Sequence, residues 1–268
     1  MKGTYLLFDI GASKIRLAVS KNGQTFGKPV IFKTPKKFSD GLNLIVSEAK
    51  KLCGGKILAA AGGIAGPLNT KKTMTINTPN LPGWSGKPLV ESLQKILKTK
   101  VILENDAAVV GLGEAVHGAG KGKSIVVYYT LSTGVNGVRI VNGKIDPSAF
   151  GFEVGFQLIN SKSLQWHIGG NELKSRFGKA PEDITSQKVW KNATMALAVG
   201  LNNTIVHWSP EVIVFGGSVM NKISILQVKK ELKKVLKIFP RHPEIKRAAL
   251  GDFGGLYGAL ALIRSRAL

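Results

Sequence analysis

The stretch VILENDAAVVGLGE, residues 101–114, contains the transition that decides the fold. It opens with a short apolar run typical of a buried strand, and a run rich in Ala, Val, Leu and Gly, compatible with a helix, begins directly after its polar residues. A strand that feeds a helix indicates an α/β protein, in which ligands collect outside the carboxyl ends of the strands. Asp106 would then be a carboxylate beside a helix N-terminus, where the dipole favours the ionised form. A purely structural alternative is that Asn105 or Asp106 only caps the helix.

Length and composition describe a globular protein. The 268 residues, 44% of them hydrophobic, allow one large domain or two modest ones with a packed core. Apolar runs stop well before the roughly 18 residues that a membrane span needs, and the first residues contain no cleavage site. We therefore expect a cytoplasmic protein without a membrane partner. Cys53 is the single cysteine, which excludes internal disulfides and a cysteine-rich metal site.

The chain carries a formal net charge of +22, which favours polyanionic partners. Its lysines are scattered over separate loops and helix faces, without interleaved aromatic residues and without a recognisable nucleic-acid motif. We expect no nucleic-acid partner. Two explanations of the charge stay open, a solvated basic surface and attraction of phosphate-rich ligands.

The first half of the chain predicts the order β-β-β-α-β-α-β-α. Ser39 and Asp40 can cap the first helix, in which apolar residues recur at helical spacing. The expected elements are strands at 4–8, 15–19 and 29–34, a helix from 39 to 52, a strand at 56–61, a glycine-rich loop at 62–67, a surface loop at 77–84, a helix at 88–97 and the strand that starts at 101.

The second half repeats this order after a glycine-rich connector at 117–123. The expected elements are strands at 124–131 and 138–141 with turns at 132–137 and 142–143, helices at 163–177 and 185–207, a strand at 211–215, a helix at 221–238, a strand at 247–250 and a helix at 254–266. This pattern predicts two β-β-β-α-β-α lobes around a cleft, residues 1–116 and 117–250. Residues 251–268 would form a C-terminal helix that packs back on the first lobe.

Each predicted lobe begins with a polar, glycine-bearing turn between strands, at 9–14 and at 132–134. Backbone N–H groups in such turns can bind anions, and two facing turns could grip a polyphosphate from both sides. The alternative is that both are ordinary hairpins. Asp9 cannot bind phosphate directly, but its carboxylate suits a Mg²⁺ ion whose remaining ligands are water and phosphate.

Successive motifs of this chain resemble those of the ROK family of sugar kinases, repressors and related proteins. The motifs are DIGASKIR at 9–16, GIAGP at 63–67, PNLPGW at 79–84, ENDAA with LGE at 104–114, TLSTG at 130–134, EVG at 153–155 and GG at 216–217. They occur in family order over nearly the whole chain, and the Asn80 loop and the Asn105-Asp106 pair are the most specific. The resemblance implies the actin-like, ribonuclease-H-like ATPase fold, in agreement with the element order.

The resemblance also implies a site. Asp106 matches the catalytic base that takes a proton from a sugar hydroxyl, usually the one on C6. The residues that match sugar ligands are Gly66, Asn80, Asn105, Glu153 and Glu172. Those that match the nucleotide site are Asp9, Gly11, Ser13, Lys14, Thr133 and Gly134 in the phosphate loops, with Gly216 and Gly217 on the adenosine side. ATP and Mg²⁺ are the implied cofactors, with Asp9 holding the metal through water, and a hexose is the implied substrate. Dimers are common in that family, although the sequence shows no interface.

The chain departs from the family pattern at two places. The kinases carry a histidine after the Glu-x-Gly motif and a cysteine cluster that together bind zinc, whereas this chain has Phe156 and no cysteine beyond Cys53. We therefore predict no zinc, and we expect His167 to be an ordinary polar residue. The lost histidine also removes a sugar contact, so the identity of the sugar does not carry over. The second phosphate loop bears larger residues where the family prefers glycine, namely Ser132, Asn136 and Val138.

Three hypotheses follow. The leading one is an ATP- and Mg²⁺-dependent hexose 6-kinase that resembles glucokinase. The second keeps the same site but uses inorganic polyphosphate, as suggested by the basic charge and the altered 132–134 turn. The third is a sugar-binding regulator without catalysis. ROK repressors carry a DNA-binding region ahead of the sugar domain, and because this sequence starts almost at its first phosphate loop, we expect such a regulator to act through a protein partner.

Overall fold

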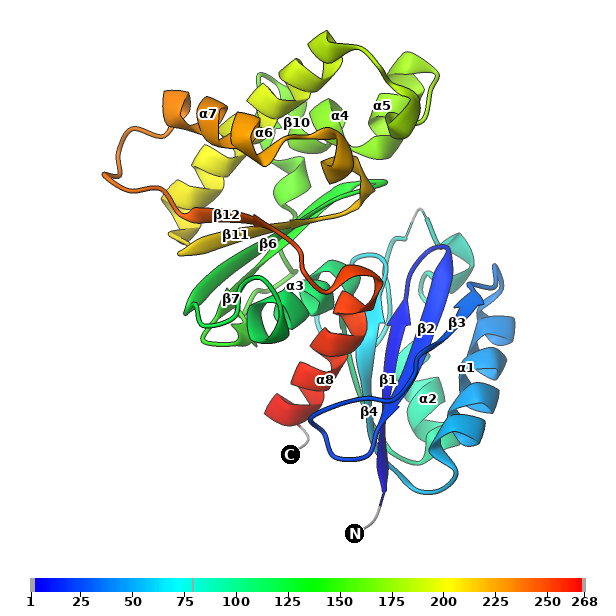
Figure 1. Cartoon of the computed structure of the whole chain (residues 1–268). Helices are drawn as coiled ribbons and strands as arrows, with labels where there is room; N and C mark the ends of the chain where they lie inside the picture. The colour runs from blue at the N-terminus through cyan, green and yellow to red at the C-terminus, as the bar shows by residue number, and fades with distance from the viewer. Residues whose placement is uncertain (1–2, 79, 267–268) are drawn as a thin grey trace. The chain divides into compact units, whose positions relative to one another are not determined.

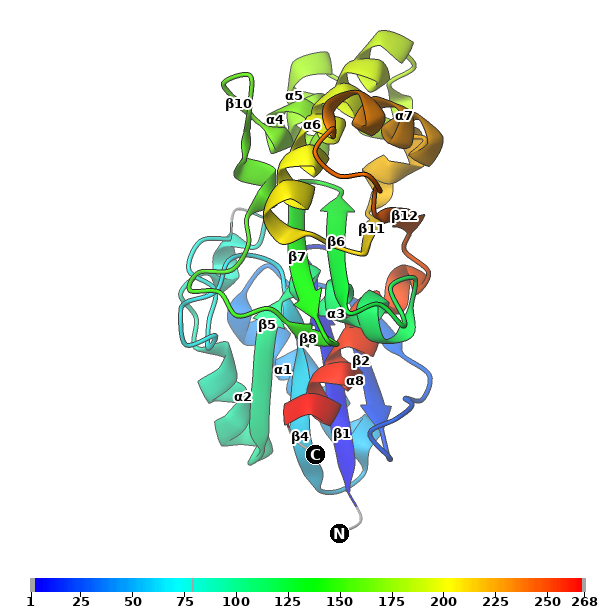
Figure 2. The same ribbon diagram turned by 90° about the vertical axis from the view of Figure 1, so that its left-hand side faces the viewer.

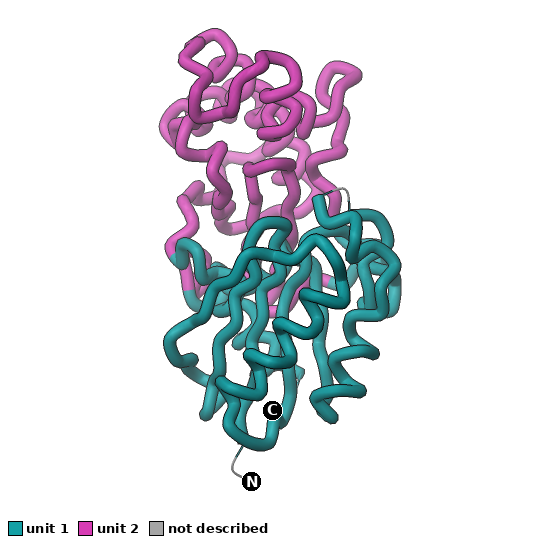
Figure 3. The backbone as a smooth tube through the Cα atoms, turned by 90° about the vertical axis from the view of Figure 1, so that its right-hand side faces the viewer, with its two compact units in different colours: residues 1–117, 147–151, 250–268 teal, residues 118–146, 152–249 magenta. Residues whose placement is uncertain are grey.

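The computed structural model describes residues 3–78 and 80–266, so Pro79 of the motif PNLPGW lies outside the described residues. The chain divides into two compact units, shown in different colours in Figure 3. Unit 1 comprises residues 1–117, 147–151 and 250–268, and unit 2 comprises residues 118–146 and 152–249. Within the described part of the chain, no helix is long and apolar enough to cross a membrane.

Unit 1 contains a five-stranded mixed sheet with the order β3-β2-β1-β4-β5. The strands are β1 Thr4–Ile10, β2 Lys14–Ser20, β3 Val30–Lys33, β4 Ile57–Ile64 and β5 Lys100–Asn105. The first three form an antiparallel meander, whereas β4 and β5 run parallel to β1. Figure 2 shows β1, β4 and β5 with their long axes aligned. The alternation of Leu6, Phe8 and Ile10 places these three side chains in one buried cluster, because successive residues of a strand face opposite sides of the sheet.

Helices cover both faces of this sheet, with α1 and α2 on one face and α3 and α8 on the other (Figure 1). Their bounds are α1 Phe38–Cys53, α2 Leu89–Leu97, α3 Asp106–His117 and α8 Gly254–Arg266, with short 3-10 turns η1 Pro82–Trp84 and η5 Gly251–Phe253. The predicted cap of α1 by Ser39 and Asp40 is wrong. The helix begins at Phe38, and the Ser39 hydroxyl donates to the Asp40 carboxylate instead.

Glycines allow α3 and α8 to pack backbone to backbone. A Cβ atom on Gly113 would lie 2.4 Å from the carbonyl oxygen of Gly254, and one on Gly258 would lie 1.7 Å from the carbonyl oxygen of Val109. A glycine also explains why β4 extends to Ile64, although a loop was predicted from residue 62. A Cβ on Gly62 would lie 1.9 Å from the Phe8 carbonyl oxygen, so the absent side chain lets the strand continue beside β1.

Unit 2 contains a second five-stranded sheet with the order β12-β11-β6-β7-β8. Its strands are β6 Ile125–Leu131, β7 Val135–Val141, β8 Lys144–Ile145, β11 Val212–Gly216 and β12 Glu244–Arg247, with a separate hairpin of β9 Leu158–Ile159 and β10 Lys162–Ser163. Its helices are α4 Leu164–Ile168, α5 Gly170–Phe177, α6 Gln187–Trp208 and α7 Ile225–Val235, with 3-10 turns η2 Val154–Phe156, η3 Pro181–Asp183 and η4 Ser218–Lys222. The core lies between the sheet and α6 and α7.

Three predicted boundaries in unit 2 are wrong for physical reasons. The helix expected at 163–177 is broken at Gly169, whose backbone is extended with φ −67° and ψ 138°. The helix expected from 221 instead begins as the 3-10 turn η4 and continues as α7 from Ile225. The last strand lies at 244–247 and not at 247–250, because this edge strand exposes polar residues and buries only Ile245, so its hydrophobic pattern is weak.

We predict that Gly258→Ala lowers the free energy of unfolding by about 1–3 kcal/mol, because the new methyl group collides with the Val109 carbonyl. Alanine favours helices over glycine by about 1 kcal/mol, so a net loss reports the collision and not helix propensity. Urea unfolding followed by circular dichroism measures the change. Gly55→Ala is the control, since a Cβ there meets no atom within 4 Å. A Gly258→Ala protein as stable as wild type would contradict this packing.

Candidate active site

The parallel strands of unit 1 bring three loops to one edge of the sheet. In the strand register Asp9 pairs with Gly63 and Gly63 with Glu104, while Ile64 pairs with Asn105 one residue later. Because parallel strands end at the same edge, the turn after Asp9, the loop at Gly66 and the start of α3 leave the sheet together. The structure therefore groups the unit 1 residues that the sequence predicted for the site.

Asn105 joins two of these loops. Its side-chain amide donates to the Gly66 carbonyl oxygen at 3.0 Å, and its Oδ1 accepts from the Ala108 N–H at 3.3 Å. Asp106 Oδ1 accepts from the Ala107 N–H at 2.8 Å. Asn105 thus caps the start of α3, and because the same side chain also binds the Gly66 loop, capping is not its only contact. Asp106 lies in the first turn of α3, where the helix dipole stabilises a carboxylate.

The loop that carries Asn80 is anchored on both sides. Gly66 has φ +116°, and a Cβ there would lie 2.8 Å from Cβ of Thr78, so the two segments touch where only glycine fits. On the other side, Trp84 is buried and its indole N–H donates to the Pro35 carbonyl at 2.9 Å. Asn80 itself is exposed in a turn between these anchors, as a residue that meets a ligand should be.

Asp9 is a buried carboxylate at the end of β1. Its Oδ2 lies 3.1 Å from Arg16 Nη1 on the facing strand, and a Cβ on Gly255 of α8 would lie 2.7 Å from its Cγ. Burial raises the pKa of Asp9, and the charge and hydrogen bond of Arg16 oppose this rise without cancelling it. The carboxylate is therefore poorly solvated, and additional positive charge beside it would be favourable.

The turn after Asp9 is closed by its own backbone. The Gly11 N–H donates to the Lys14 carbonyl at 3.0 Å, and the Thr34 hydroxyl donates to the Gly11 carbonyl at 2.7 Å. The amide of Gly11 is thus used inside the turn. Ser13 and Lys14 are exposed at its tip, so they are the members of the predicted set that can reach a phosphate.

The Asp9 surroundings fit a Mg²⁺ ion that keeps water and phosphate oxygens as most of its ligands. Such an ion needs one or two protein carboxylates, and Asp9 supplies one whose burial is only partly compensated by Arg16. Among the described residues no cluster of three or more His, Cys, Asp or Glu could hold a metal. Asp9 together with phosphate oxygens would suit this metal.

In unit 2, the turn at 132–134 presents two backbone donors in one direction. The carbonyl oxygens of Ser132 and Thr133 accept from the N–H groups of Gly170 and Asn171, at 2.8 and 2.9 Å. A trans peptide holds its C=O and N–H on opposite sides, so the N–H groups of Thr133 and Gly134 point away from α5. Two adjacent N–H groups with this orientation form an anion-binding concavity.

The remaining unit 2 residues of the predicted set surround this turn. A Cβ on Gly217, which has φ +90°, would lie 2.3 Å from the Leu131 carbonyl, directly before the turn. A Cβ on Gly155 would lie 2.0 Å from the Val135 carbonyl, directly after it, and this places the Glu153 loop there. Glu172 lies in the first turn of α5, whose N-terminus binds the turn. Val138, one of the three residues that stand where the family prefers glycine, is buried in the sheet.

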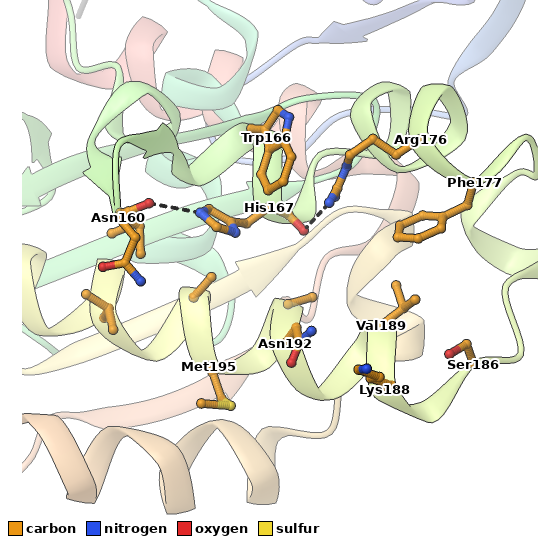
Figure 4. A pocket seen from close by; sticks show the side chains of 14 residues that line it. Asn160, Trp166, His167, Arg176, Phe177, Ser186, Lys188, Val189, Asn192 and Met195 are labelled. Carbon is orange, nitrogen blue, oxygen red and sulfur yellow. Dashed lines mark hydrogen bonds between the residues drawn. The ribbon is translucent and has the colours of Figure 1, made fainter.

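The described residues of unit 2 line at least two cavities. One, of about 940 Å³, lies between the starts of α6 and α7 and is lined by five lysines, Lys188, Lys191, Lys222, Lys230 and Lys234. The other, of about 530 Å³, lies between α5 and α6 (Figure 4). There the Arg176 guanidinium stacks 4.0 Å from the Trp166 ring centroid, and His167 Nε2 lies 3.0 Å from the Ile159 carbonyl oxygen. His167 is thus engaged by the backbone of its own unit.

Sequence reasoning missed three neighbours of the predicted residues. Arg16 lies opposite Asp9 in the hairpin register, a pairing that the short turn at 11–14 would have revealed. Gln165 Oε1 accepts from the Val135 N–H at 3.2 Å and would lie 2.9 Å from a Cβ on Gly134. Glu104 is buried and pairs with Lys72 at 2.7 Å, a contact between distant segments that no local pattern signals.

Comparison with known proteins gives a consistent result. A family model described as the ROK family matches residues 5–162 and 162–266. A glucokinase of Pyrobaculum calidifontis is 29% identical over 96% of this chain and 94% of its own. An N-acetyl-D-glucosamine kinase of Escherichia coli O127:H6 is 31% identical over 96% of this chain and 98% of its own. Among solved structures, a ROK hexokinase of Thermus thermophilus matches with a TM-score of 0.87 at 23% identity, over 99% of this chain and 100% of its own.

We predict that Arg16→Met destabilises the protein in a pH-dependent way. Without Arg16 the pKa of Asp9 rises further above its unfolded value, so the ionised carboxylate becomes more costly in the folded state. The loss should be about 3 kcal/mol at pH 8 and should shrink towards pH 5, because protonation of Asp9 removes the unpaired charge.

Urea unfolding at both pH values in the presence of a chelator measures this difference. Lys51→Met serves as the control, because its pair with Glu48 is exposed and contributes less than about 1 kcal/mol. An equal loss for Arg16→Met at pH 8 and pH 5 would show that Arg16 acts through packing and not through the charge of Asp9.

Proposed function

The chain belongs to the ROK family and is a sugar kinase with the actin-like ATPase fold, and we propose that it transfers the γ-phosphoryl group of ATP to a hydroxyl of a hexose, the one on C6. Two relatives that span its length are named for phosphorylation of glucose and of N-acetyl-D-glucosamine. We accordingly propose glucose or a closely related hexose as the acceptor.

The observation that carries this proposal is the junction of β4, β5 and α3. Asn105 fixes the Gly66 loop to the start of α3 through one side chain, so the Gly66 backbone and the Asp106 carboxylate keep a constant spacing. A sugar ring offers several hydroxyls at fixed separations, and a rigid set of amide, carbonyl and carboxylate groups matches such a ligand. Asn80, exposed on its anchored loop, would add a further amide.

Asp106 is proposed as the general base. Its carboxylate accepts the proton of the sugar hydroxyl while the oxygen of that hydroxyl forms a bond to the γ-phosphorus. The bond from the γ-phosphorus to the bridging oxygen breaks, and its electron pair leaves with ADP. Asp106 lies in the first turn of α3, where a helix dipole favours the carboxylate form that a general base requires.

The donor side needs groups that hold phosphate oxygens and stabilise negative charge, because phosphoryl transfer depends mainly on positioning and electrostatics. We propose that the N–H groups of Thr133 and Gly134 bind phosphate oxygens and that the exposed tip of the first turn, Ser13 and Lys14, binds them as well. Gly216 and Gly217 would flank the adenosine. Mg²⁺, when bound with the nucleotide beside Asp9, supplies positive charge to the phosphates.

We predict that Asp106→Ala lowers kcat for hexose phosphorylation by about 10²–10⁴-fold, because general-base catalysis contributes this much. A coupled assay of ADP release over a panel of hexoses and N-acetylhexosamines measures turnover. Asp40→Ala is the matched control, since Asp40 is an exposed aspartate in the first turn of α1 and should leave kcat unchanged. Absence of turnover with every sugar, or wild-type turnover in Asp106→Ala, would refute the proposal. Sugar binding by calorimetry without transfer would indicate a regulator.

One observation favours inorganic polyphosphate as a second donor. Lys222, which lines the lysine-lined cavity, lies at the end of the turn η4, and this turn directly follows Gly217. Its one acidic side chain is Glu231, which already pairs with Lys234 at 2.7 Å. The cavity therefore keeps a strong positive charge, which suits a chain of phosphates better than an uncharged adenosine.

We predict that the double variant Lys191→Ala, Lys230→Ala lowers kcat/KM for polyphosphate at least tenfold at low salt and leaves kcat/KM for ATP within twofold. Loss of two cationic contacts weakens polyanion binding, and added salt should reduce the difference by screening. The same coupled reaction, read out by sugar phosphate formation, compares the donors. Lys50→Ala, Lys95→Ala in α1 and α2 serves as the charge-matched control. Turnover with ATP alone in the wild type would refute the polyphosphate alternative.

A further inference from the structure

Glu153 lies on a loop that is held to the rest of unit 2 by the buried Val154 and by Gly155, which packs against Val135. The loop leads into the 3-10 turn η2, where the Phe156 N–H donates to the Glu153 carbonyl at 3.0 Å. The neighbouring Phe156 is 62% exposed and gives the loop little anchorage. Glu153 is exposed, and partial desolvation raises the pKa of its carboxyl. Whatever fixes this loop therefore decides how the carboxylate is presented.

The residue after η2, Gln157, adds side-chain hydrogen bonds to this loop. Its Nε2 donates to the Val154 carbonyl oxygen at 3.0 Å and to the Tyr129 hydroxyl at 3.4 Å. Its Oε1 accepts from the Asn203 side-chain amide at 3.1 Å. One side chain thus ties the carbonyl of Val154, the residue after Glu153, to strand β6 and helix α6.

The direction of each hydrogen bond in this group can be assigned. The Thr204 hydroxyl donates to the Gly200 carbonyl at 3.1 Å, so its oxygen accepts the proton of Tyr129, 2.5 Å away. The Tyr129 oxygen is then the acceptor for Gln157, and both N–H bonds of the Gln157 amide are used. Each group therefore donates to the next in the order Asn203, Gln157, Tyr129 and Thr204, and no two donors face each other.

Burial makes this chain costly to break. Tyr129 has no exposed surface and Thr204 is buried, so an unpaired donor or acceptor there would cost about 1–3 kcal/mol. Burial raises the pKa of Tyr129 to about 12, which keeps its hydroxyl protonated at neutral pH. Gly200 lets α6 approach, since a Cβ there would lie 3.3 Å from Gln157 Nε2. The amide of Gln157 is therefore held in one orientation.

We propose that Gln157 is the positioning residue of the Glu153 loop, holding the sugar-contacting carboxylate in place through the hydrogen bond from its side-chain amide to the Val154 carbonyl. This proposal rests on the proposed hexose kinase function and on the role of Glu153 as a hexose ligand, which the family resemblance implies. Gln157 itself touches no substrate. This role requires a side chain whose NH2 group donates a hydrogen bond and whose oxygen accepts another that fixes its orientation. Glutamine provides both groups, whereas ionised glutamate, of the same shape, has no donor.

The test is Gln157→Glu, which keeps the size of the side chain and removes both N–H donors when ionised. We expect the KM for the hexose to rise at least tenfold at pH 8, with the KM for ATP within twofold of wild type. A protonated glutamic acid regains one donor, so the ratio of hexose KM values between variant and wild type should fall as the pH is lowered to 6. A general loss of structure would alter both KM values together.

Tyr129→Phe provides the matched control. It disturbs the same buried chain but keeps the hydrogen bond from Gln157 to Val154, so it should lower stability in urea and leave the hexose KM within threefold of wild type. If Gln157→Glu does not fold, Gln157→Met removes donor and acceptor together with a milder penalty, and the same rise in hexose KM is expected.

The outcomes separate this proposal from the proposed function. Wild-type turnover with an unchanged hexose KM in Gln157→Glu or its methionine substitute would overturn the positioning role alone. An equal rise of the hexose KM in Tyr129→Phe would also overturn it, because the effect would then follow core stability. No hexose turnover in the wild type would overturn the function, and the positioning role with it.

Discussion

The candidate site depends on the close parallel alignment of β1, β4 and β5. Hydrogen bonding in register places Asp9, Gly63 and Glu104 side by side, so the loops that follow must emerge together. Glycines make this alignment compact, since a Cβ on Gly62 would strike the Phe8 carbonyl and one on Gly63 would lie 3.1 Å from Cα of Asp106. Larger residues there would separate the strands and disperse the carboxylates. The sheet is thus the scaffold of the site, and its glycines determine the spacing.

In unit 2 the candidate site residues are positioned by different contacts. Its turn at 132–134 owes its shape to carbonyl contacts with the start of α5, and those contacts orient the opposite N–H groups. The Glu153 loop is anchored by the buried Val154 and receives a side-chain hydrogen bond from Gln157. Backbone dipoles thus supply the anion-binding groups, while a buried polar chain supplies the rigidity. Both features are expected of an enzyme whose chemistry is mainly positioning.

Much of the fold could be predicted from sequence because its elements are strongly patterned. The helix at 254–266 agrees with α8, and the order of strands and helices in the first half is correct. Prediction errors arose at glycines, because a glycine can either continue an element or interrupt it. Gly62 continues a strand and Gly169 interrupts a helix, and the difference depends on Phe8 and Gln165, which lie elsewhere in the chain or one turn away. Tertiary contacts, absent from any local pattern, decide such cases.

The roles of the predicted site residues remain proposals, and Gln157 was not predicted because a half-buried glutamine has no sequence signature. The central claim is that the junction at Asn105 and Gly66 forms a sugar site in front of Asp106. A crystal structure of the protein with a bound hexose tests this most directly. We predict a sugar hydroxyl within hydrogen-bond distance of the Asp106 carboxylate, with Asn80 and Asn105 on other hydroxyls. A hexose bound elsewhere, without contact to Asp106, would contradict the account.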